Sequence, residues 1–452
     1  MRAMIMMTSE GKYNILTYGC QMNVYDSEVL AGHLEGMGYR AAGDGEAADV
    51  LILNTCAVRK KAEDKVFSRL GMVRELKKNN PQMIVVLWGC MAQQKGMAAL
   101  LKGRFKFIDL ICGPNSLERF PELLERVRVR NFKKTLVDLE MSGERESFPV
   151  KRTEGVKAWV PISHGCNNFC SYCVVPYVRG PEISRKPENI IKEIEELINT
   201  GYKEITLLGQ NVNSYGKDLH GEYSFAYLLR RLEGMADFLR IRFMTSHPRD
   251  FSPEIIRAIA ESKNVCEHIH LPLQSGSDRI LKDMNRGYTR DYYLGLIDKI
   301  REMIPESSIT TDIIVGFPGE EEEDYNLTLE IMNKVRFDAA YTFVYSPRKG
   351  TKAAEMKNQI SAEIKKKRIT RLNTVQNQIV LEKNEPLVGS VQEILVEGMS
   401  KTDEQMYIGR TRTNKIVHFP LADNSSEDLT GKFVNIKIQE AGPWSLSGII
   451  IN

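Results

Sequence analysis

Short apolar runs alternate with longer amphipathic stretches through the first part of the chain. The apolar runs cover residues 13–18, 50–53, 83–88 and 107–111, and helical patterns follow them at 27–37, 62–78, 95–102 and 117–127. The runs have the length of strands, and the stretches between them have the length of helices. This alternation predicts an α/β fold with a parallel, doubly wound sheet that carries helices on both faces.

A strand and helix unit then recurs through the middle of the chain. Strands are expected at 158–163, 205–208, 240–245, 268–273, 310–315 and 340–345. The first connecting helix is well defined, because Ile190, Ile194 and Leu197 fall on one stripe and Gly201 ends it. Six such units are too few for an eightfold barrel. They predict a partial, open (β/α)6 barrel with its chemistry at the carboxyl ends of the strands.

The pattern changes again near Pro386, after a helical stretch at 361–382. Short β-like runs at 393–397, 406–410, 415–419 and 433–438 are separated by turn residues, which is typical of a small β-barrel. A charged, turn-rich connection at 131–157 separates the first two parts. We therefore expect an α/β domain at 11–128, the partial barrel at 152–384 and the small β-barrel at 386–450.

The composition is that of an ordinary globular protein. Of the 452 residues, 42% are hydrophobic and 27% are charged, which excludes a largely disordered, collagen-like or disulfide-stapled chain. No apolar run approaches the ~20 residues of a membrane span, and the N-terminal apolar stretch is too short for a signal peptide. We therefore expect a cytoplasmic protein without a membrane segment. The 62 basic and 59 acidic residues leave a net charge of +3, so any RNA binding must use local patches.

Three of the eight cysteines form a tight cluster. Cys166, Cys170 and Cys173, here called the loop cysteines, follow the first expected barrel strand in a Cys-x3-Cys-x2-Cys pattern. In a reducing cytoplasm such a cluster indicates metal binding or catalysis rather than disulfides. Three thiolates on one loop can each take one iron of a 4Fe-4S cubane and leave the fourth iron open for substrate. The alternatives are a zinc site completed by His164, or incidental buried cysteines.

Three further cysteines stand alone, yet each comes just after an expected strand of the α/β domain. We call Cys20, Cys56 and Cys90 the strand-end cysteines. The carboxyl ends of parallel strands share the sheet edge where ligands bind, so three loops can converge there. Spacing alone also permits chance burial, and it does not exclude Cys112, which follows a strand too, as a fourth ligand. Cys266 precedes a strand, at the opposite end of the barrel, and is expected in the core.

Motifs along nearly the whole chain resemble one enzyme family. The cysteine loop, with the aromatic Tyr172 before its last cysteine, resembles the radical S-adenosylmethionine superfamily. Residues 17–23 (TYGCQMN), 54–56 (NTC), 89–93 (GCMAQ) and 164–180 resemble its methylthiotransferases, and the tail from Pro386 resembles their RNA-binding TRAM domain. Residues 18–28 (YGCQMNVYDSE) are similar to the MiaB-type branch, which methylthiolates isopentenylated adenosine beside the tRNA anticodon.

The resemblance implies two 4Fe-4S clusters and S-adenosylmethionine as cofactors. The loop cysteines would hold the cluster that binds S-adenosylmethionine at its open iron and releases a 5′-deoxyadenosyl radical, which activates carbon 2 of the adenine. The strand-end cysteines would hold the second cluster, on which the sulfur is carried and methylated by another S-adenosylmethionine. No residue is expected to act as a general acid or base, and the family pattern gives Cys112 no role.

Polar residues at the carboxyl ends of the barrel strands are expected to line the cofactor pocket. These residues are Gln210, Asn211, Ser246, Gln274 and Asp312, and Tyr172 is placed to present its backbone to the adenine ring. Polar turns, caps and simple packing are the alternative interpretations of the same positions.

RNA contact is expected on a local face of the C-terminal domain. Residues 386–452 hold six Lys or Arg against eight Asp or Glu, so the domain as a whole is not basic. The predicted face combines Arg410, Arg412 and Lys415 with Phe419 and Trp444 for base stacking.

The resemblance also implies partners for a monomeric enzyme. They are the tRNA anticodon stem-loop, an electron donor such as a flavodoxin or ferredoxin, and a sulfur or iron-sulfur delivery system. The alternatives within the enzyme class are the relatives that act on threonylcarbamoyl adenosine in tRNA or on an aspartate of a ribosomal protein. The alternative of another class is a non-catalytic iron-sulfur protein that binds RNA or acts as a sensor, which would not need the cofactor-pocket motifs.

Overall fold

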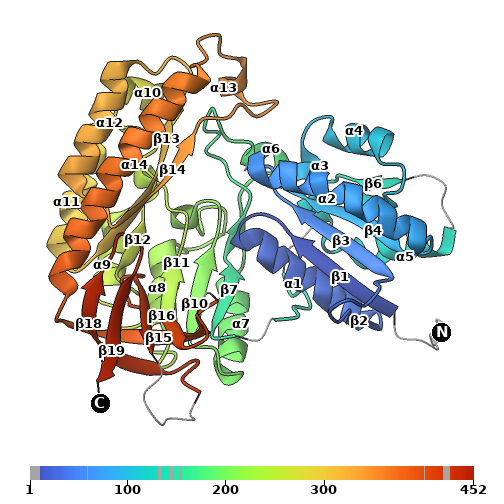
Figure 1. The fold of residues 1–452 in the computed structure, drawn as a ribbon, viewed down its shortest axis with the longest axis horizontal. Helices are drawn as coiled ribbons and strands as arrows, with labels where there is room; N and C mark the ends of the chain where they lie inside the picture. The colour runs from blue at the N-terminus through green and yellow to red at the C-terminus, as the bar shows by residue number, and fades with distance from the viewer. Residues whose placement is uncertain are drawn as a thin grey trace.

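The computed structural model describes residues 11–58, 60–130, 135–141, 146–152, 155–401, 403–420 and 428–451. Three parts follow one another along the chain (Figure 1). The N-terminal part, drawn in blue, lies beside the central barrel, and the C-terminal part, drawn in red, packs against one end of that barrel. Within these ranges every helix is too short or too polar to cross a membrane.

A six-stranded parallel sheet of order β2-β1-β3-β4-β5-β6 forms the N-terminal part. Its strands are β1 (Gly11–Thr17), β2 (Tyr39–Ala41), β3 (Val50–Thr55), β4 (Ile84–Gly89), β5 (Leu110–Cys112) and β6 (Leu136–Asp138). Its helices are α1 (Gln21–Gly36), α2 (Lys60–Asn79), α3 (Cys90–Gln93), α4 (Met97–Arg104) and α5 (Phe120–Arg130), with the 3-10 turn η1 (Pro114–Ser116). The strand order reverses between β1 and β3, which is where doubly wound sheets bind ligands.

Apolar side chains cover both faces of this sheet. Val29 of α1 and Phe120 of α5 belong to the core on one face, whereas Val66 of α2 and Leu101 of α4 belong to the core on the other. The predicted doubly wound α/β sheet is therefore confirmed.

Six parallel strands and their helices form the barrel. The strands are β7 (Lys157–Pro161), β10 (Glu204–Leu208), β11 (Arg240–Phe243), β12 (His268–His270), β13 (Ser308–Val315) and β14 (Ala339–Val344). They form two three-stranded sheets, and a parallel bridge between Ile241 and Val265 joins the two. The helices are α6 (Val175–Arg179), α7 (Pro187–Asn199), α8 (Phe225–Leu232), α9 (Pro253–Ala260), α10 (Asp278–Asp283), α11 (Arg290–Met303), α12 (Glu322–Val335), α13 (Lys352–Glu355) and α14 (Ala362–Asn384). Short pieces complete it: β8 (Ser163–His164), β9 (Ile183–Ser184), η2 (Val212–Ser214) and η3 (Pro248–Asp250).

The predicted partial barrel is confirmed, and it is open along β14, the edge strand of its sheet. Ile309 and Ile313 of β13 face the helices and belong to the main core. The opposite face of the same strands carries Asp312 beside Tyr341 and continues to Phe343. Tyr341 is 48% exposed and Phe343 is 37% exposed, so the interior of the open barrel presents aromatic rings to solvent.

A closed barrel of order β15-β16-β17-β19-β18 forms the C-terminal part. After η4 (Glu385–Leu387), its strands are β15 (Val391–Met399), β16 (Met406–Arg410), β17 (Ile416–Pro420), β18 (Phe433–Ala441) and β19 (Leu446–Ile451). Ile394, Val417 and Ile436 fill its core. The expected small β-barrel is confirmed, with β19 as a strand that the sequence pattern did not predict.

The C-terminal part closes the amino-terminal end of the central barrel. Arg242 of β11 donates hydrogen bonds to the carbonyls of Thr411 and Arg412, each at 2.7 Å. Arg240 of the same strand donates to the carbonyl of Arg410 at 2.7 Å. These contacts hold the loop after β16 against the starts of the barrel strands.

Three buried ion pairs among the described residues join the N-terminal part to the barrel. Arg179 of α6 binds Asp26 at 2.8 Å, and Arg152, just before β7, binds Glu28 at 2.7 Å. Arg348, after β14, lies 3.3 Å from Glu63. All six side chains are largely or fully buried, so these pairs are part of the interior of the junction.

Two edge strands of the N-terminal sheet were not predicted. β2 is only three residues long, and β6 lies inside the stretch that the sequence assigns to a connection. The side chains of β6 are half-buried, so its own sequence carries little apolar signal. Pairing with a neighbouring strand, more than the propensity of the residues, forms such edge strands.

Candidate active site

The strand-end cysteines lie together at one edge of the N-terminal sheet. β1, β3 and β4 are neighbours in the sheet, and Cys20, Cys56 and Cys90 directly or closely follow their carboxyl ends. A side chain at Gly19, next to Cys20, would lie 2.8 Å from the Cβ of Cys56, and Cys90 packs with Ala57, the residue after Cys56. The structure thus brings together the three loops that the sequence predicted to converge.

A glycine and two buried amides shape the turns that carry these cysteines. Gly89 has a φ of 104°, and a side chain there would lie 2.5 Å from the carbonyl oxygen of Thr55, so only glycine fits. The side-chain oxygen of Asn23 accepts a hydrogen bond from the backbone N–H of Cys20 at 3.3 Å, and its Nδ2 donates to Asn54 at 2.9 Å. These contacts fix the turn after β1 to the end of β3.

A buried arginine from the barrel contacts the strand-end cysteines. Arg179, the last residue of α6, donates from Nε to Cys90 Sγ at 3.1 Å and from Nη2 to Asp26 at 2.8 Å. Burial raises the pKa of the Cys90 thiol to about 12, and the positive charge of Arg179 acts in the opposite direction. Metal loading has to remove thiol protons, so this arginine offsets part of that cost.

The loop cysteines follow β8, and hydrogen bonds from Ser171 hold their loop against the end of α10. Ser171 donates from Oγ to the carbonyl of Asp283 at 2.7 Å and from its backbone N–H to the carbonyl of Met284 at 3.0 Å. Burial raises the pKa of Cys166 to about 11 and that of Cys173 to about 12. The loop therefore holds its thiols in an enclosed environment.

A second buried arginine lies against the loop cysteines. Arg286, which is 4% exposed, donates to Cys170 Sγ at 3.4 Å and to the carbonyl of Pro272 at 3.0 Å. No Asp or Glu in the described ranges forms an ion pair with it. A buried cation without a carboxylate partner is costly. An anionic iron-sulfur cluster on the loop cysteines would supply the missing negative charge.

Unpartnered polar atoms gather at the carboxyl ends of the barrel strands. The buried side-chain oxygens of Gln210, Asn211, Ser246 and Gln274 have no hydrogen-bond partner among the described residues. Buried polar groups are normally satisfied, so this group of atoms indicates a ligand with several polar groups. The amino, carboxylate and ribose groups of S-adenosylmethionine fit that requirement, and these residues keep their predicted role as its candidate contacts.

Asp312 and Tyr172, the other predicted cofactor contacts, have different surroundings. Asp312 faces the open interior of the barrel, where Oδ1 lies 3.5 Å from His270 Nε2 and the side chain is 28% exposed. The side chain of Tyr172 packs on an apolar cluster with Phe317 and Tyr345. Its ring is thus part of the packing, and contact of its backbone with an adenine stays a prediction.

The remaining two cysteines lie in cores. Cys112 belongs to the apolar cluster under α1 and α5, and Cys266 is buried near Arg242 at the opposite end of the barrel. Nowhere in the described chain do three or more His, Cys, Asp or Glu side chains surround a single ion position. A zinc ion requires such a group, whereas a cubane takes one thiolate per iron. The cluster assignment and the zinc alternative for these cysteines both stay predictions.

Comparison with known proteins decides the family. Residues 12–113 match the family described as "Uncharacterized protein family UPF0004", residues 160–332 match the "Radical SAM superfamily", and residues 386–451 match the "TRAM domain". A curated protein of Carboxydothermus hydrogenoformans, named tRNA-2-methylthio-N(6)-dimethylallyladenosine synthase, is 52% identical over 98% of this chain and 100% of its own length. This chain belongs to the tRNA-2-methylthio-N(6)-dimethylallyladenosine synthase family. A synthase of the same name from Pelotomaculum thermopropionicum is 53% identical over 97% of each chain.

Solved structures share the fold at much lower identity. The radical S-adenosylmethionine methyltransferase TsrM from Kitasatospora setae, solved with cobalamin and a [4Fe-4S] cluster, has a TM-score of 0.57 and 14% identity over 85% of this chain and 81% of its own. At this identity the likeness shows the fold alone. Membership of the synthase family, together with the radical SAM match, gives S-adenosylmethionine and 4Fe-4S clusters as the cofactors, as the sequence predicted.

In this member of the synthase family, the residues expected to bind RNA make contacts within the protein itself. Phe419 is fully buried in the C-terminal barrel and stacks on Tyr407, so its predicted role in base stacking is wrong. Arg412 binds Glu267 of the central barrel at 2.6 Å and also donates to two backbone carbonyls. Its donors face the interdomain contact, and its contact with RNA stays a prediction.

Arg410 and Lys415, the other two predicted RNA contacts, also have carboxylate partners. Arg410 lies 3.0 Å from Glu397, and Lys415 lies 3.2 Å from Asp338. Both side chains are at most half-exposed. Their charges are therefore largely neutralised by neighbours, and their contacts with RNA stay predictions.

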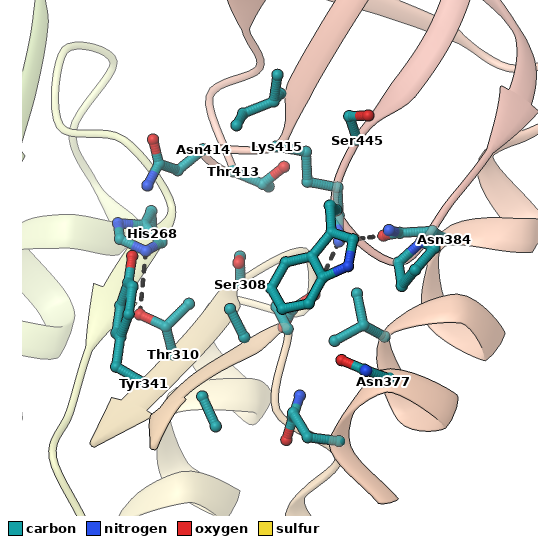
Figure 2. Close-up of a pocket in the computed structure, with 18 of the residues that line it drawn as sticks. His268, Ser308, Thr310, Tyr341, Asn377, Asn384, Thr413, Asn414, Lys415 and Ser445 are labelled. Carbon is teal, nitrogen blue, oxygen red and sulfur yellow. Dashed lines mark hydrogen bonds and ion pairs between the residues drawn. The ribbon is translucent and has the colours of Figure 1, made fainter. Parts of the chain in front are cut away.

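A pocket lies between the central barrel, α14 and the C-terminal part (Figure 2). Its volume is about 330 Å³, and its wall includes His268 from the barrel, Asn377 from α14 and Lys415 from the C-terminal part. Trp444 also lines the pocket and is 77% exposed. Trp444, rather than Phe419, is thus an aromatic residue of the C-terminal part with a free face.

Sequence reasoning missed the two buried arginines beside the cysteines. Arginine is usually exposed, so no role was assigned to Arg179 or Arg286. A signal for Arg179 was present, because it ends the apolar segment 174–179 directly after the loop cysteines. Arg286 carried no such local signal, since its partners Cys170 and Pro272 come from other segments of the chain.

Proposed function

We propose that this chain adds a methylthio group to carbon 2 of isopentenylated adenosine beside the anticodon of tRNA. The observation that carries the proposal is the 52% identity, over 98% of the chain, to a synthase named for that product. The match spans all three parts of the fold, including the parts with the loop cysteines and the strand-end cysteines.

The loop cysteines would hold one 4Fe-4S cluster, and the strand-end cysteines would hold a second. When bound, the clusters and S-adenosylmethionine supply the one-electron chemistry that an unreactive aromatic carbon-hydrogen bond requires. The chain itself encloses that chemistry, since Val174 and Val178 of the α6 segment pack with Ala57 and Cys90 in one buried cluster. This cluster covers one side of Cys90 with apolar side chains.

The open interior of the barrel would receive the modified base. Tyr341 and Phe343 offer aromatic faces there, and Ile314 adds apolar surface on the same side of the sheet. A planar adenine with a branched alkenyl group is matched by such a surface, because aromatic side chains stack on bases and the alkenyl group is apolar. Asp312 would provide a polar acceptor beside these rings.

Exposed aromatic residues beside the cysteines support the tRNA anticodon stem-loop as the substrate. Phe169 in the cysteine loop is 48% exposed and Tyr177 of α6 is 47% exposed, with their ring centroids 5.8 Å apart. Unpaired bases of RNA loops stack on rings of this kind. The exposed face of Trp444 would add a contact to the stem-loop at the other end of the barrel. The reaction also consumes electrons and sulfur, so it requires a one-electron donor, such as a flavodoxin or ferredoxin, and a sulfur or iron-sulfur delivery system.

Replacing Tyr177 by alanine is expected to weaken binding of the anticodon stem-loop by about 1–3 kcal/mol, or roughly 5- to 150-fold in Kd. The reason is the loss of one stacking surface. Fluorescence anisotropy with labelled stem-loop RNA at a fixed salt concentration measures the change. Tyr177→Phe keeps the ring and is expected to bind like the wild type. An alanine variant with unchanged Kd would remove Tyr177 from the RNA-binding surface.

Nucleoside analysis of tRNA tests the function itself. Cells that lack this protein are expected to lose 2-methylthio-isopentenyl adenosine and to regain it when the gene is returned. If that nucleoside were unchanged while 2-methylthio-threonylcarbamoyl adenosine or a methylthiolated ribosomal protein disappeared, one of the two related activities would replace the proposal. Purified protein that forms no 5′-deoxyadenosine from S-adenosylmethionine with a strong reductant would instead favour a non-catalytic RNA-binding or sensor protein.

A further inference from the structure

Arg179 belongs to the polypeptide segment of one cysteine set but contacts the other. It ends α6, which begins shortly after Cys173, and its side chain is 3% exposed. Its Nε donates to Cys90 Sγ at 3.1 Å, and its Nη2 donates to Asp26 at 2.8 Å. The guanidinium therefore donates hydrogen bonds to a sulfur and to a carboxylate at the same time.

The elements around Arg179 fix this arrangement. Asp26 lies on α1, the helix that begins directly after Cys20, and is itself fully buried. Val178 of α6 packs with Ala57, which follows Cys56, and with Cys90. Figure 1 shows α6 beside α3, the short helix that begins with Cys90. Arg179 is thus held among all three strand-end loops by a segment that continues from the loop cysteines.

We infer that Arg179 is a positioning residue that hydrogen-bonds the Cys90 thiolate of the second cluster and raises the reduction potential of that cluster. This inference rests on the proposed function, which assigns a cluster to the strand-end cysteines. Reduction adds negative charge to a cluster, and hydrogen bonds to its sulfurs are among the factors that set its potential. A charge-assisted donor in a buried site is a strong form of that interaction.

The geometry distinguishes this role from that of a simple ion pair. An arginine that only neutralised Asp26 would place both of its parallel donors on the carboxylate. Here Nε donates to Cys90 and Nη2 to Asp26, so the planar guanidinium, with its fixed donor directions, serves a sulfur and a carboxylate at once. Lysine has a single charged nitrogen and cannot reproduce that arrangement.

The test uses a chain with only the second cluster. Cys166, Cys170 and Cys173 are replaced by alanine, and the potential of the remaining cluster is measured by an anaerobic redox titration followed by electron paramagnetic resonance. In this background, the double variant Arg179→Gln with Asp26→Asn removes both charges together, so no buried charge is left without a partner. We expect at least a tenfold fall in the equilibrium constant for reduction, which for one electron is about 59 mV toward more negative potential.

The matched control is Arg348→Gln with Glu63→Gln. This pair crosses the same junction and is also buried, and within the described part of the chain neither side chain hydrogen-bonds a sulfur. Each double variant leaves the net charge unchanged, so a difference between them reports the hydrogen bond to sulfur. The control is expected to keep the potential of the background protein.

Each outcome bears on the inference. An unchanged potential in the Arg179 double variant, or an equal shift in the control, overturns it. If the double variant fails to hold a cluster, the single variant Arg179→Lys decides, because it keeps the positive charge but cannot donate to the sulfur and the carboxylate in the same way. A lower reduction potential in this variant supports the inference, and an unchanged potential overturns it. If the background protein itself holds no cluster, the assignment of the second cluster fails, and the inference fails with it.

Discussion

Alanine at all three loop cysteines is expected to abolish both 5′-deoxyadenosine formation and methylthiolation while leaving about four irons per chain. The two cysteine sets are held by separate elements, one by the loop after β8 and the other by the ends of β1, β3 and β4. Loss of the first set therefore leaves the ligands of the second in place. Iron and sulfide assays after anaerobic reconstitution, with chromatography of the products, measure both effects.

The reverse variant is the control. Alanine at Cys20, Cys56 and Cys90 is expected to keep 5′-deoxyadenosine formation and to stop methylthiolation, because only the cluster that carries sulfur is lost. Complete loss of iron from the loop variant, with the protein still folded by circular dichroism, would contradict two independent clusters and indicate one shared site.

Replacing Arg242 by methionine is expected to destabilise the barrel by about 3–5 kcal/mol, since it leaves a buried carboxylate without its main partner. Arg242 binds Glu204 at 2.7 Å, and the two side chains are 5% and 2% exposed. Arg242 also donates hydrogen bonds to two backbone carbonyls of the C-terminal part. Lys157 lies 3.5 Å from Glu204 and does not replace these two hydrogen bonds. Thermal unfolding of the iron-free protein is expected to show a fall in Tm of roughly 6–20 °C.

The double variant Arg242→Met with Glu204→Gln separates the cost of the unpaired Glu204 carboxylate from the cost of the lost hydrogen bonds to the C-terminal part. It removes the uncompensated charge and is expected to recover a large part of the loss. Burial raises the pKa of Glu204, but Arg242 and Lys157 outweigh it and hold the pKa below the ordinary value. The stabilisation is therefore present above the usual glutamate range and is lost as pH falls through the folded-state pKa. Equal Tm values for the single variant and the wild type near neutral pH would contradict this account.

The fold was largely predictable because its strands and helices have strong patterns of their own. The runs at 50–53 and 83–88 became β3 and β4, and the stripe through Ile190, Ile194 and Leu197 became α7. The unpredicted strands β2 and β6 depend instead on the strands beside them. α1 begins at Gln21, earlier than predicted, because the turn held by Asn23 starts the helix directly after Cys20.

The candidate site was predictable for the residues that come directly after a strand. It was not predictable for residues whose partners lie far away in the sequence. Cysteines after parallel strands meet at one edge whatever the rest of the chain does. Arg179 and Arg286 become informative only when folding brings a sulfur beside them. The error at Phe419 has a simpler origin, since alternate residues of a strand face opposite sides and this one faces the core.

The three buried ion pairs at the junction bear on how a bulky RNA would reach the two cysteine sets. Arg152 with Glu28, Arg179 with Asp26, and Arg348 with Glu63 are spread over separate segments, so a hinge motion between the N-terminal part and the barrel would break all of them together. Such a motion would break three well-paired contacts at once, and hydration of the freed charges would offset only part of that loss. We therefore expect the substrate to enter sideways, past the open edge at β14, with the two cysteine sets kept at a constant separation throughout turnover.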